Sequence, residues 1–380
     1  LFGINFCSIF GYFTFKKQIM KKLLLSALIL FATSHGVRSQ VLQSDNFDSY
    51  NVGNVGTLTD GTEPGQGGWF TAINATGSDN TNNENFQFVA ADSNDKDFRF
   101  TGSATAAGTR FMWQDGLVAA WAARTTGNEI IEVEFDYFTG GTTTSNNDFR
   151  VYIFSDETPA KVLAGISVAK NLLVSGVNFS NVVRGFLHWS QGTEASTGTY
   201  SIGLGASAAD PLTLPVDTLV RLGFSFNKTT GQVIWKSSLG LNGSFSGTPT
   251  FPMVTAGINP GEIDFLGVAG ANNTVSSFAD FDNYLVRASA TDTLLSVSNE
   301  FATANFSIYP NPASDVVNVN AGDLLINSVQ VTDINSRVIN KINVALSSTA
   351  EINVSNLTSG IYFLTVATDQ GVGTSKIVKK

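Results

Sequence analysis

The most constraining feature of this sequence is a long series of short strand-like runs separated by turns rich in Gly, Asn, Ser and Thr. In the clearest run, Ile130–Phe138, the apolar residues Val133, Phe135 and Tyr137 alternate with acidic residues. Side chains alternate between the two faces of a strand, so this period of two predicts a strand with one apolar face. Such runs recur over residues 41–288, and one sheet cannot bury its own apolar face. We therefore expect two packed sheets.

The other runs fit the same interpretation. They cover residues 149–154, 184–189, 200–204, 220–227, 232–237 and 281–287. Residues 227–231 lie between two of them, and Gly231 there can adopt the positive φ that a tight hairpin turn requires. With 36 glycines and only 14% charged residues, the composition is typical of short strands joined by turns. The sequence predicts an all-β central domain over residues 41–289.

The first forty residues have the pattern of an export signal with an upstream extension. Met-Lys-Lys at 20–22 precedes a mostly apolar stretch of ten residues at 23–32, and small residues follow at Val37 and Ser39. We interpret residues 1–19 as translated upstream sequence and 20–39 as a signal peptide, with cleavage before Gln40. Ten residues are too few to span a bilayer of about 30 Å as a helix.

Removal of this signal makes the chain more acidic. The chain has 22 Lys and Arg against 31 Asp and Glu, and residues 1–40 hold five of the basic residues and none of the acidic ones. The remainder carries 17 basic and 31 acidic residues, a net charge of −14. Such a surface repels nucleic acid, so we expect no nucleic-acid partner. The single cysteine, Cys7, would be lost, and His188 would be the one histidine left, which disfavours disulfides, thiolate sites and zinc.

Several segments of the central domain resemble the concanavalin-like jelly roll of lectins, laminin-G-like domains and carbohydrate-binding modules. They are DNFDSY at 45–50, VRLGFSF at 220–226 with QVIW at 232–235, and FDNYLV at 281–286. The resemblance implies a jelly-roll β-sandwich whose first and last strands pair. It also implies a carbohydrate ligand.

An acidic row, Glu132, Glu134 and Asp136, occupies the second face of the run at 130–138. Retaining glycoside hydrolases need an acid and a nucleophile with carboxyl groups about 5–5.5 Å apart, and alternate residues of a strand can supply that spacing. Family-16 glycoside hydrolases share the jelly roll and carry a similar row, but they have Asp at the position of Glu134 and Glu near that of Asp136. A solvated strand face explains the same alternation without chemistry. Catalysis by these residues is the alternative to binding.

Short acidic and amide residues gather at both ends of the domain. Asp45 and Asp48 lie near its start, and Asp280 and Asp282 lie near its end. In jelly-roll binding modules a structural Ca²⁺ often sits where the first and last strands meet, and calcium takes six to eight oxygen ligands. Short polar side chains also cap turns without any metal. The sequence-based expectation is a structural Ca²⁺ held by these four aspartates.

The chain has five tryptophans, whose flat apolar faces are suited to stacking against sugar rings. Trp235 alternates with Val233 in its run and is expected in the core. Trp69 follows the glycine-rich segment 65–68, and Trp113 precedes a turn at 114–116. Because they lie beside loops, Trp69 and Trp113 are the predicted carbohydrate-binding residues.

A small, polar stretch at 290–304 has the composition of a linker, and a distinct β pattern follows it. That pattern contains FSIYPNP at 306–312, VQVTD at 329–333, SGIYFL at 359–364 and KIVKK at 376–380. The series resembles the C-terminal sorting domain of proteins exported by the type IX secretion system of Gram-negative bacteria, although Ser336 stands where the family usually has Gly. The expected sorting signal comprises Tyr309, Pro310, Asn311, Pro312, Gly360, Tyr362, Lys379 and Lys380.

The strand-like runs of residues 305–380 predict a small immunoglobulin-like β-sandwich. The resemblance implies that the type IX machinery recognises this domain and that the protein is secreted or attached to the outer-membrane surface. The leading hypothesis is an exported, lectin-like protein that binds a polysaccharide or glycan without cleaving it. A polysaccharide hydrolase or lyase, and a surface adhesin with protein partners, are the alternatives.

Overall fold

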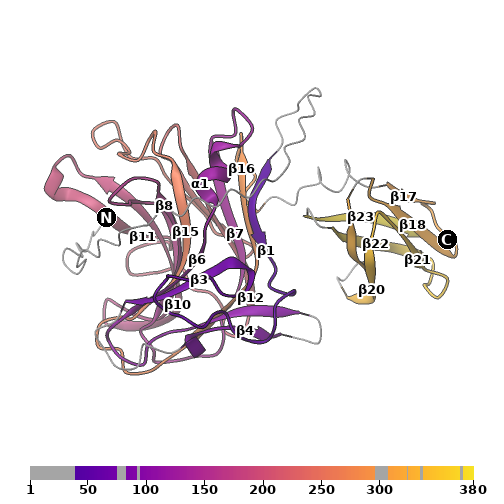
Figure 1. The fold of residues 1–380 in the computed structure, drawn as a ribbon, viewed down its shortest axis with the longest axis horizontal. Coiled ribbons are helices and arrows are strands. Elements are labelled where there is room, and N and C mark those ends of the chain that lie inside the picture. Colours follow the sequence, from indigo (N-terminus) through magenta and orange to yellow (C-terminus); the bar gives the residue numbers. More distant parts are fainter. Residues whose placement is uncertain are drawn as a thin grey trace. The chain divides into compact units, whose positions relative to one another are not determined.

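The computed structural model describes residues 39–74, 83–91, 95–295, 307–322, 324–333, 337–368 and 371–380. The chain divides into a first compact unit that ends at Leu295 and a second that begins at Ser296 (Figure 1). The predicted upstream segment, all but the last residue of the predicted signal peptide, and residues 296–304 of the predicted linker lie outside the described residues. In the described chain, no helix is long and apolar enough to cross a membrane.

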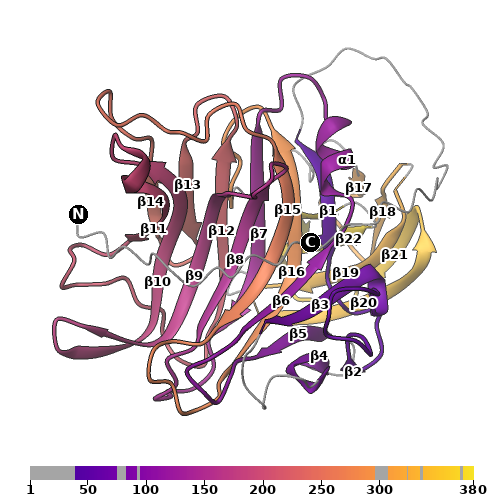
Figure 2. The same cartoon turned by 60° about the vertical axis from the view of Figure 1, so that its left-hand side comes forward.

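The described part of the first unit is a jelly-roll β-sandwich of two sheets, A and B, and Figure 2 shows both layers. Sheet A has the order β14–β13–β12–β7–β16–β5–β4–β2, with β1 also paired to β16. Its strands are β1 (Gln40–Asp45), β2 (Gly53–Asn54), β4 (Phe86–Ala90), β5 (Lys96–Thr101), β7 (Ile130–Phe138), β12 (Leu219–Asn227), β13 (Val233–Ser237), β14 (Asn242–Phe245) and β16 (Phe278–Ser289). Sheet B has the order β11–β10–β9–β8–β15–β6–β3. Its strands are β3 (Trp69–Asn74), β6 (Thr109–Gln114), β8 (Asp148–Ser155), β9 (Val162–Val174), β10 (Val177–Ser190), β11 (Thr197–Gly203) and β15 (Pro260–Val268).

The pairings confirm the main sequence-based expectations for this unit. β7 has the bounds that the alternation predicts, and β12 and β13 form the expected hairpin, in which Gly231 has a φ of 73°. β1 pairs antiparallel with the C-terminal half of β16, and β5 pairs with its N-terminal half. The first and last strands of the domain therefore lie side by side, as the jelly roll requires.

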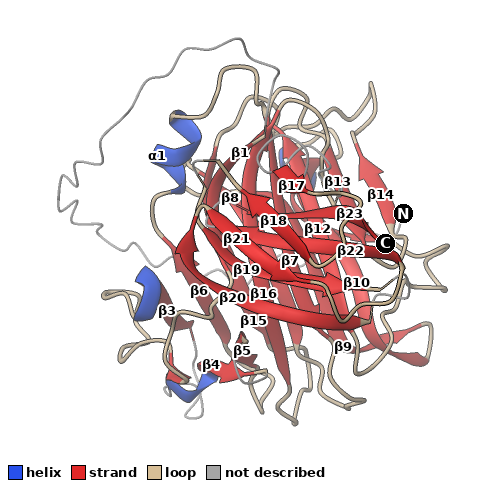
Figure 3. Cartoon of the chain, turned by 90° about the vertical axis from the view of Figure 1, so that its right-hand side faces the viewer, coloured by secondary structure: helices blue, strands red, loops and turns tan. Residues whose placement is uncertain are grey.

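Helical elements of the described chain are short (Figure 3). They are α1 (Leu117–Ala122) and the 3₁₀ turns η1 (Gln66–Gly68), η2 (Asn83–Asn85) and η3 (Glu194–Ser196). Helix α1 buries Leu117 and Trp121, and the guanidinium of Arg124 lies 3.9 Å from the centroid of the Trp121 ring. Trp121 is thus part of the core rather than a surface for ligands.

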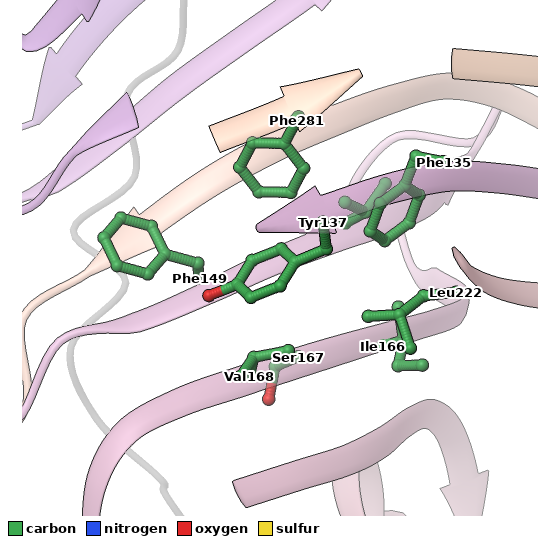
Figure 4. A pocket seen from close by; sticks show the side chains of 9 residues that line it. Phe135, Tyr137, Phe149, Ile166, Ser167, Val168, Leu222 and Phe281 are labelled. Carbon is green, nitrogen blue, oxygen red and sulfur yellow. The ribbon is translucent and has the colours of Figure 1, made fainter. Parts of the chain in front are cut away.

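Aromatic side chains fill the space between the sheets. Figure 4 shows residues of sheet A (Phe135, Tyr137, Leu222 and Phe281) facing residues of sheet B (Phe149, Ile166 and Val168). The gap between them has no room for a water molecule, so it is packed core and not a ligand cavity. Trp235 is 0% exposed, which confirms its predicted place in the core, and its ring lies against the backbone of Gly185.

The second unit is a small β-sandwich, as predicted. Sheet C has the order β17–β18–β21 and sheet D the order β20–β19–β22–β23. Their strands are β17 (Ser307–Tyr309), β18 (Val316–Asn320), β19 (Ile326–Thr332), β20 (Val338–Ser347), β21 (Thr349–Asn353), β22 (Gly360–Thr368) and β23 (Gly371–Lys379). Val317, Val329, Leu364 and Ile377, each 0% exposed, form the centre of its own apolar core.

Candidate functional site

The acidic row of β7 lies on the outward face of sheet A, but it is buried. The side chains of Glu132 and Glu134 are 0% and 7% exposed. Arg287, which is opposite Glu132 on β16, donates from Nε to Glu132 at 2.9 Å and from Nη2 to Glu134. Arg221 of β12 lies 3.3 Å from both Glu134 and Asp136. Two arginines therefore bind the three carboxylates.

Residues 290–295, which we call the strap, cover this network. Thr293 donates to Glu132 from its backbone nitrogen at 2.5 Å and from its hydroxyl at 2.6 Å. The backbone nitrogen of Leu295 donates to Glu134 at 2.8 Å. Leu294 is 1% exposed and lies against Gly223, where a Cβ would stand 2.8 Å from the leucine Cδ1. The first residues of the predicted linker thus belong to the first unit.

This closed network argues against the catalytic interpretation of Glu132 and Glu134, whose side chains are 0% and 7% exposed. A catalytic acid or nucleophile must reach its substrate within hydrogen-bonding distance. The two glutamates are instead enclosed by arginine and strap donors, and Asp136 is held by Arg221 and by the amide of Asn283 at 2.8 Å. The alternation placed the row on the correct face but did not reveal the strap.

Farther along the same face, three aspartates lie on adjacent strands of sheet A. Asp282 pairs with Asp136, and the pairing of β5 with β16 brings Asp97 beside Asp282. Burial raises the pKa of Asp97 to about 7 and that of Asp282 to about 8. The charges of neighbouring aspartates, including Asp95, contribute to both of these shifts after burial, because like charges disfavour ionisation.

The raised pKa values predict that stability decreases as the pH rises. An aspartate in the unfolded chain loses its proton near pH 3.8, whereas Asp97 and Asp282 keep theirs to about pH 7 and 8 in the folded protein. Between these pH values the folded state binds more protons, so the free energy of unfolding falls as pH rises from about 4 to about 8. Asp97→Asn should weaken this dependence between pH 4 and 7. Urea unfolding at pH 4.5 and 7.5 measures the free energy of unfolding of the variant and of the unmodified protein. An equal loss of stability between these pH values in both proteins would contradict the raised pKa of Asp97.

The four aspartates expected to bind calcium, Asp45, Asp48, Asp280 and Asp282, do not form one ligand set. Asp280 accepts two bonds of 2.7 Å from Nε and Nη2 of Arg99. Asp45 accepts a backbone N–H and a tryptophan ring N–H, and Asp48 accepts a backbone N–H at 3.0 Å. Among the described residues, no three His, Cys, Asp or Glu side chains gather closely enough to hold a metal ion. Binding of a structural Ca²⁺ stays a prediction, which unfolding temperatures with calcium and with chelator would check.

Trp69 is buried, so the prediction that it stacks on a sugar is wrong. Its side chain is 1% exposed at the start of β3, and its ring meets Phe265 and Tyr284 edge-on at 5.8 and 5.7 Å. Its indole N–H donates to Asp45 at 2.8 Å. The ring therefore presents no face to a ligand.

Trp113 has a different position, on the outward face of sheet B. It is half-buried on β6 and stacks on Phe70 of β3, with ring centroids 5.5 Å apart and planes inclined by 13°. One edge of its ring lies against Gly61, where a Cβ would stand 2.7 Å from Cη2. The loop that bears this glycine supports the stacked pair. Sugar binding by Trp113 stays a proposal.

The outward face of sheet B carries a row of side chains that crosses neighbouring strands. Trp113 pairs with Asp264, Asp264 with Tyr152, Tyr152 with Gly165, and Gly165 with Phe186. Gly165 has no side chain, so the ring of Tyr152 lies across it, 5.2 Å from the ring of Phe186. Strands lie about 4.8 Å apart, so the four steps of this row span roughly 19 Å.

Two arginines lie beside this row. Arg150 and Arg184 both donate to the same oxygen of Asp148 at 2.6 Å, and their side chains are 23% and 22% exposed. Arg150 also donates to the hydroxyl of Tyr152 at 3.0 Å, and its guanidinium lies 4.9 Å from the ring centroid of Phe186. One carboxylate holds both cations in place, which leaves further N–H donors at the surface.

We call this surface the aromatic–arginine face. It comprises the half-buried Phe70 and Trp113, the partly exposed Arg150 and Arg184, and the buried rings of Tyr152 and Phe186, which are 5% and 6% exposed. His188 follows Phe186 on the same side of β10, and burial, together with the charge of Lys161, lowers its pKa. His188 is therefore neutral at pH 7 and can donate or accept a hydrogen bond there.

Trp113 was predicted from its position in the sequence, but the other residues of this face were not. A signal was present in β8, where Arg150 and Tyr152 alternate with the inward residues Val151 and Ile153. That alternation shows which side chains share a face, but it does not show which strands lie next to β8. Only the register brings β6, β8 and β10 into one surface.

A shallow depression of about 500 Å³ lies elsewhere, beside β2. Its lining consists of residues 54–57, 64–66 and Asn83, none of which has an aromatic or ionisable side chain. Its polar groups are amides, one threonine hydroxyl and the backbone, so the aromatic–arginine face is the better candidate.

The predicted sorting-signal residues lie at the edge of sheet D and in the core of the second unit. The amide of Asn311 donates to the carbonyl of Lys376 and accepts from the N–H of Val378, both at 2.9 Å. Tyr362 is 8% exposed and points into the core, and its hydroxyl donates to the carbonyl of Thr358 at 3.0 Å. Tyr309, Pro310, Pro312 and Lys380 are exposed, and Gly360 and Lys379 are half-buried. Much of the predicted signal therefore holds the domain together.

Known structures resemble the chain only distantly. A non-specific endo-β-1,3(4)-glucanase from family GH16 has a TM-score of 0.40 and 10% identity, over 67% of this chain and 94% of that one. The carbohydrate recognition domain of Emp46p has a TM-score of 0.33 and 11% identity, over 64% and 98%. The botulinum neurotoxin serotype D/C binding domain has a TM-score of 0.35 and 10% identity, over 84% and 72%. Similarities of this size carry no conclusion about ligand or activity.

No curated relative matches the chain. The family described as "Secretion system C-terminal sorting domain" matches residues 307–380, which span the strands of the second unit from β17 to the C-terminus. This match confirms the resemblance that the sequence motifs carried. Residues 307–380 therefore belong to the family of secretion system C-terminal sorting domains.

Proposed function

We propose that the first unit binds carbohydrate without cleaving it, and that the aromatic–arginine face is the binding surface. The observation that carries this proposal is that the half-buried Phe70–Trp113 stack and the partly exposed Arg150 and Arg184 share the outward face of sheet B. The sorting domain marks the protein for export to the cell surface or the medium. A face of this kind would there meet extracellular polysaccharides.

The chemistry of the face suits a sugar. The C–H faces of a sugar ring pack on aromatic rings, and the half-buried Phe70–Trp113 stack offers such a surface. Hydroxyl groups of a sugar accept hydrogen bonds from arginine. With tyrosine or neutral histidine they can either donate or accept. Arg150, Arg184 and His188 supply these groups along the row. The roughly 19 Å span fits a chain of several sugars rather than a single one.

We expect no catalysis by the carboxylates that the sequence singled out or by Asp148. The paired glutamates that resembled a hydrolase are enclosed by Arg287 and the strap. On the aromatic–arginine face, Asp148 is held by two arginines and is 4% exposed. These carboxylates cannot approach a glycosidic bond, so we expect retention of a polysaccharide without release of sugar.

Affinity electrophoresis through gels that contain neutral or acidic polysaccharides tests the proposal. We expect retardation of the purified protein, no reducing sugar in the supernatant, and binding by Trp113→Ala that is roughly two- to tenfold weaker because one ring stack is lost. The matched control is Phe278→Ala, which removes a half-buried ring from the outward face of sheet A, where Arg99 covers it at 4.1 Å.

Other outcomes would assign a different function. Release of reducing sugar would make the protein a hydrolase or lyase. Equal binding by Trp113→Ala and the unmodified protein would move the site away from this face. No retention by any polysaccharide would leave an adhesin with protein partners, and it would contradict the proposal.

A further inference from the structure

The sorting domain exposes apolar side chains on the outward face of sheet D, where they take no part in its own core. On β22, Tyr362 and Leu364 point into the core, so Ile361 and Phe363 point outward from sheet D. They are 46% and 36% exposed, and Val338 at the start of β20 is 52% exposed. Exposed apolar side chains that lie together on one surface indicate an interaction site.

The register places these residues close together. Phe363 pairs with Thr332 on one side, and Thr332 pairs with Val338, so Phe363 and Val338 lie in one cross-strand row. Ile361 is two residues from Phe363 on the same strand and pairs with Val378. Adjacent strands are about 4.8 Å apart, so Val338 lies two strand spacings from Phe363, with Thr332 between them, whereas Ile361 directly neighbours Phe363 on one face of β22.

Lysines border this group. Lys376 pairs with Phe363 in the same row and is exposed, and Lys341 pairs with Gln330 in the next row, which continues through Thr365. The carboxylate closest in sequence to Val338 is that of Asp333. Its Oδ2 lies 3.1 Å from Nε of Arg337, with which it forms an ion pair. We call this surface the sorting face. It comprises Val338, Lys341, Ile361, Phe363 and Lys376.

The sorting domain that bears this face is less acidic than the part of the chain before it. Residues 41–306 carry 12 basic and 26 acidic residues, whereas residues 307–380 carry five of each. The predicted sorting-signal residues adjoin this face, since Asn311 bonds to the backbone of β23 at Lys376 and Val378. These bonds hold β23, the strand that bears Lys376, in place. Asn311 and Tyr362 themselves make contacts within the domain.

We propose that the sorting face is the surface by which the secretion system recognises this domain. Its partner is a component of that system with an apolar patch bordered by carboxylates. Phe363 and Ile361 would be buried at the centre of the contact, where apolar and aromatic residues contribute most of the binding energy. Lys341 and Lys376 would lie at its rim, where complementary charge speeds encounter and selects the partner.

Export of the full chain in a Gram-negative host with a type IX secretion system tests the proposal. The measured quantity is the fraction of the protein at the cell surface and in the medium against the fraction retained in the cell. We expect Phe363→Ser combined with Ile361→Ser to lower the exported fraction roughly tenfold, as the loss of one strong contact would. Lys341→Glu combined with Lys376→Glu should also lower it. Leu173→Ser, which alters a 64% exposed residue of the first unit, is the matched control.

The charge-reversal variant separates recognition from folding. Its lysines point away from the core, so limited proteolysis of the purified chain should show a folded sorting domain. Normal export of both double variants would overturn the proposal. A wild-type dimer in size-exclusion chromatography that Phe363→Ser dissociates would also overturn it, because the face would then bind a second copy of the chain.

Discussion

Replacing Arg287 with Ala should lower the free energy of unfolding of the first unit by about 3–5 kcal/mol, because it leaves two buried carboxylates without their shared partner. Glu132 and Glu134 would retain the backbone donors of the strap but no cation from β16. Urea unfolding followed by tryptophan fluorescence measures this effect. All five tryptophans lie between residues 69 and 235, so the signal reports on the first unit alone.

Lys161→Ala is the matched control for this experiment. The Lys161–Glu157 ion pair is also short, at 2.6 Å, but its side chains are 35% and 42% exposed, so its loss should cost only about 0–1 kcal/mol. Arg287→Met combined with Glu132→Gln and Glu134→Gln should recover part of the loss, because no charge remains unpaired. Equal effects of Arg287→Ala and Lys161→Ala would contradict the claim that this network holds the strap.

Phe265→Ala should be about as damaging, at about 3–5 kcal/mol, because it opens a cavity between the sheets. Phe265 of β15 is 0% exposed, and its ring meets aromatic rings of both sheets at centroid distances of 5.0–6.2 Å. Its aromatic neighbours are Trp69, Phe98, Phe135, Phe281 and Tyr284. The same urea unfolding experiment measures the loss.

Two further variants make the result interpretable. Phe265→Leu keeps part of the buried volume and should cost less than Phe265→Ala. Phe278→Ala removes a half-buried ring at the surface of sheet A and should also cost less. If Phe278→Ala were as destabilising as Phe265→Ala, the main core would not lie between the two sheets.

The alternation of apolar and polar residues predicted most of the fold. It gave the bounds of β7, the hairpin of β12 and β13, and the burial of Trp235, since each of these depends on neighbouring residues. It could not assign Trp69, because a glycine-rich loop before a strand does not determine which face the first strand residue occupies. Trp69 turned inward to meet Phe265.

The candidate site was harder to predict because its parts are distant in sequence. Glu132 and Glu134 were placed on the correct face, but the strap that covers them begins more than 150 residues later, and a polar segment gives no sign of where it docks. The aromatic–arginine face needs the register of β6, β15, β8, β9 and β10, which no single strand contains. Only Trp113 was found from its own position.

Amide hydrogen exchange with and without a retained polysaccharide tests the central claim most directly. If the aromatic–arginine face binds the glycan, peptides from β6, β8 and β10 should exchange more slowly in the complex, and peptides from β7, β12 and β16 should be unchanged. Protection confined to sheet A, or equal protection of Trp113→Ala and the unmodified protein at a glycan concentration near the Kd of the unmodified protein, would contradict the claim.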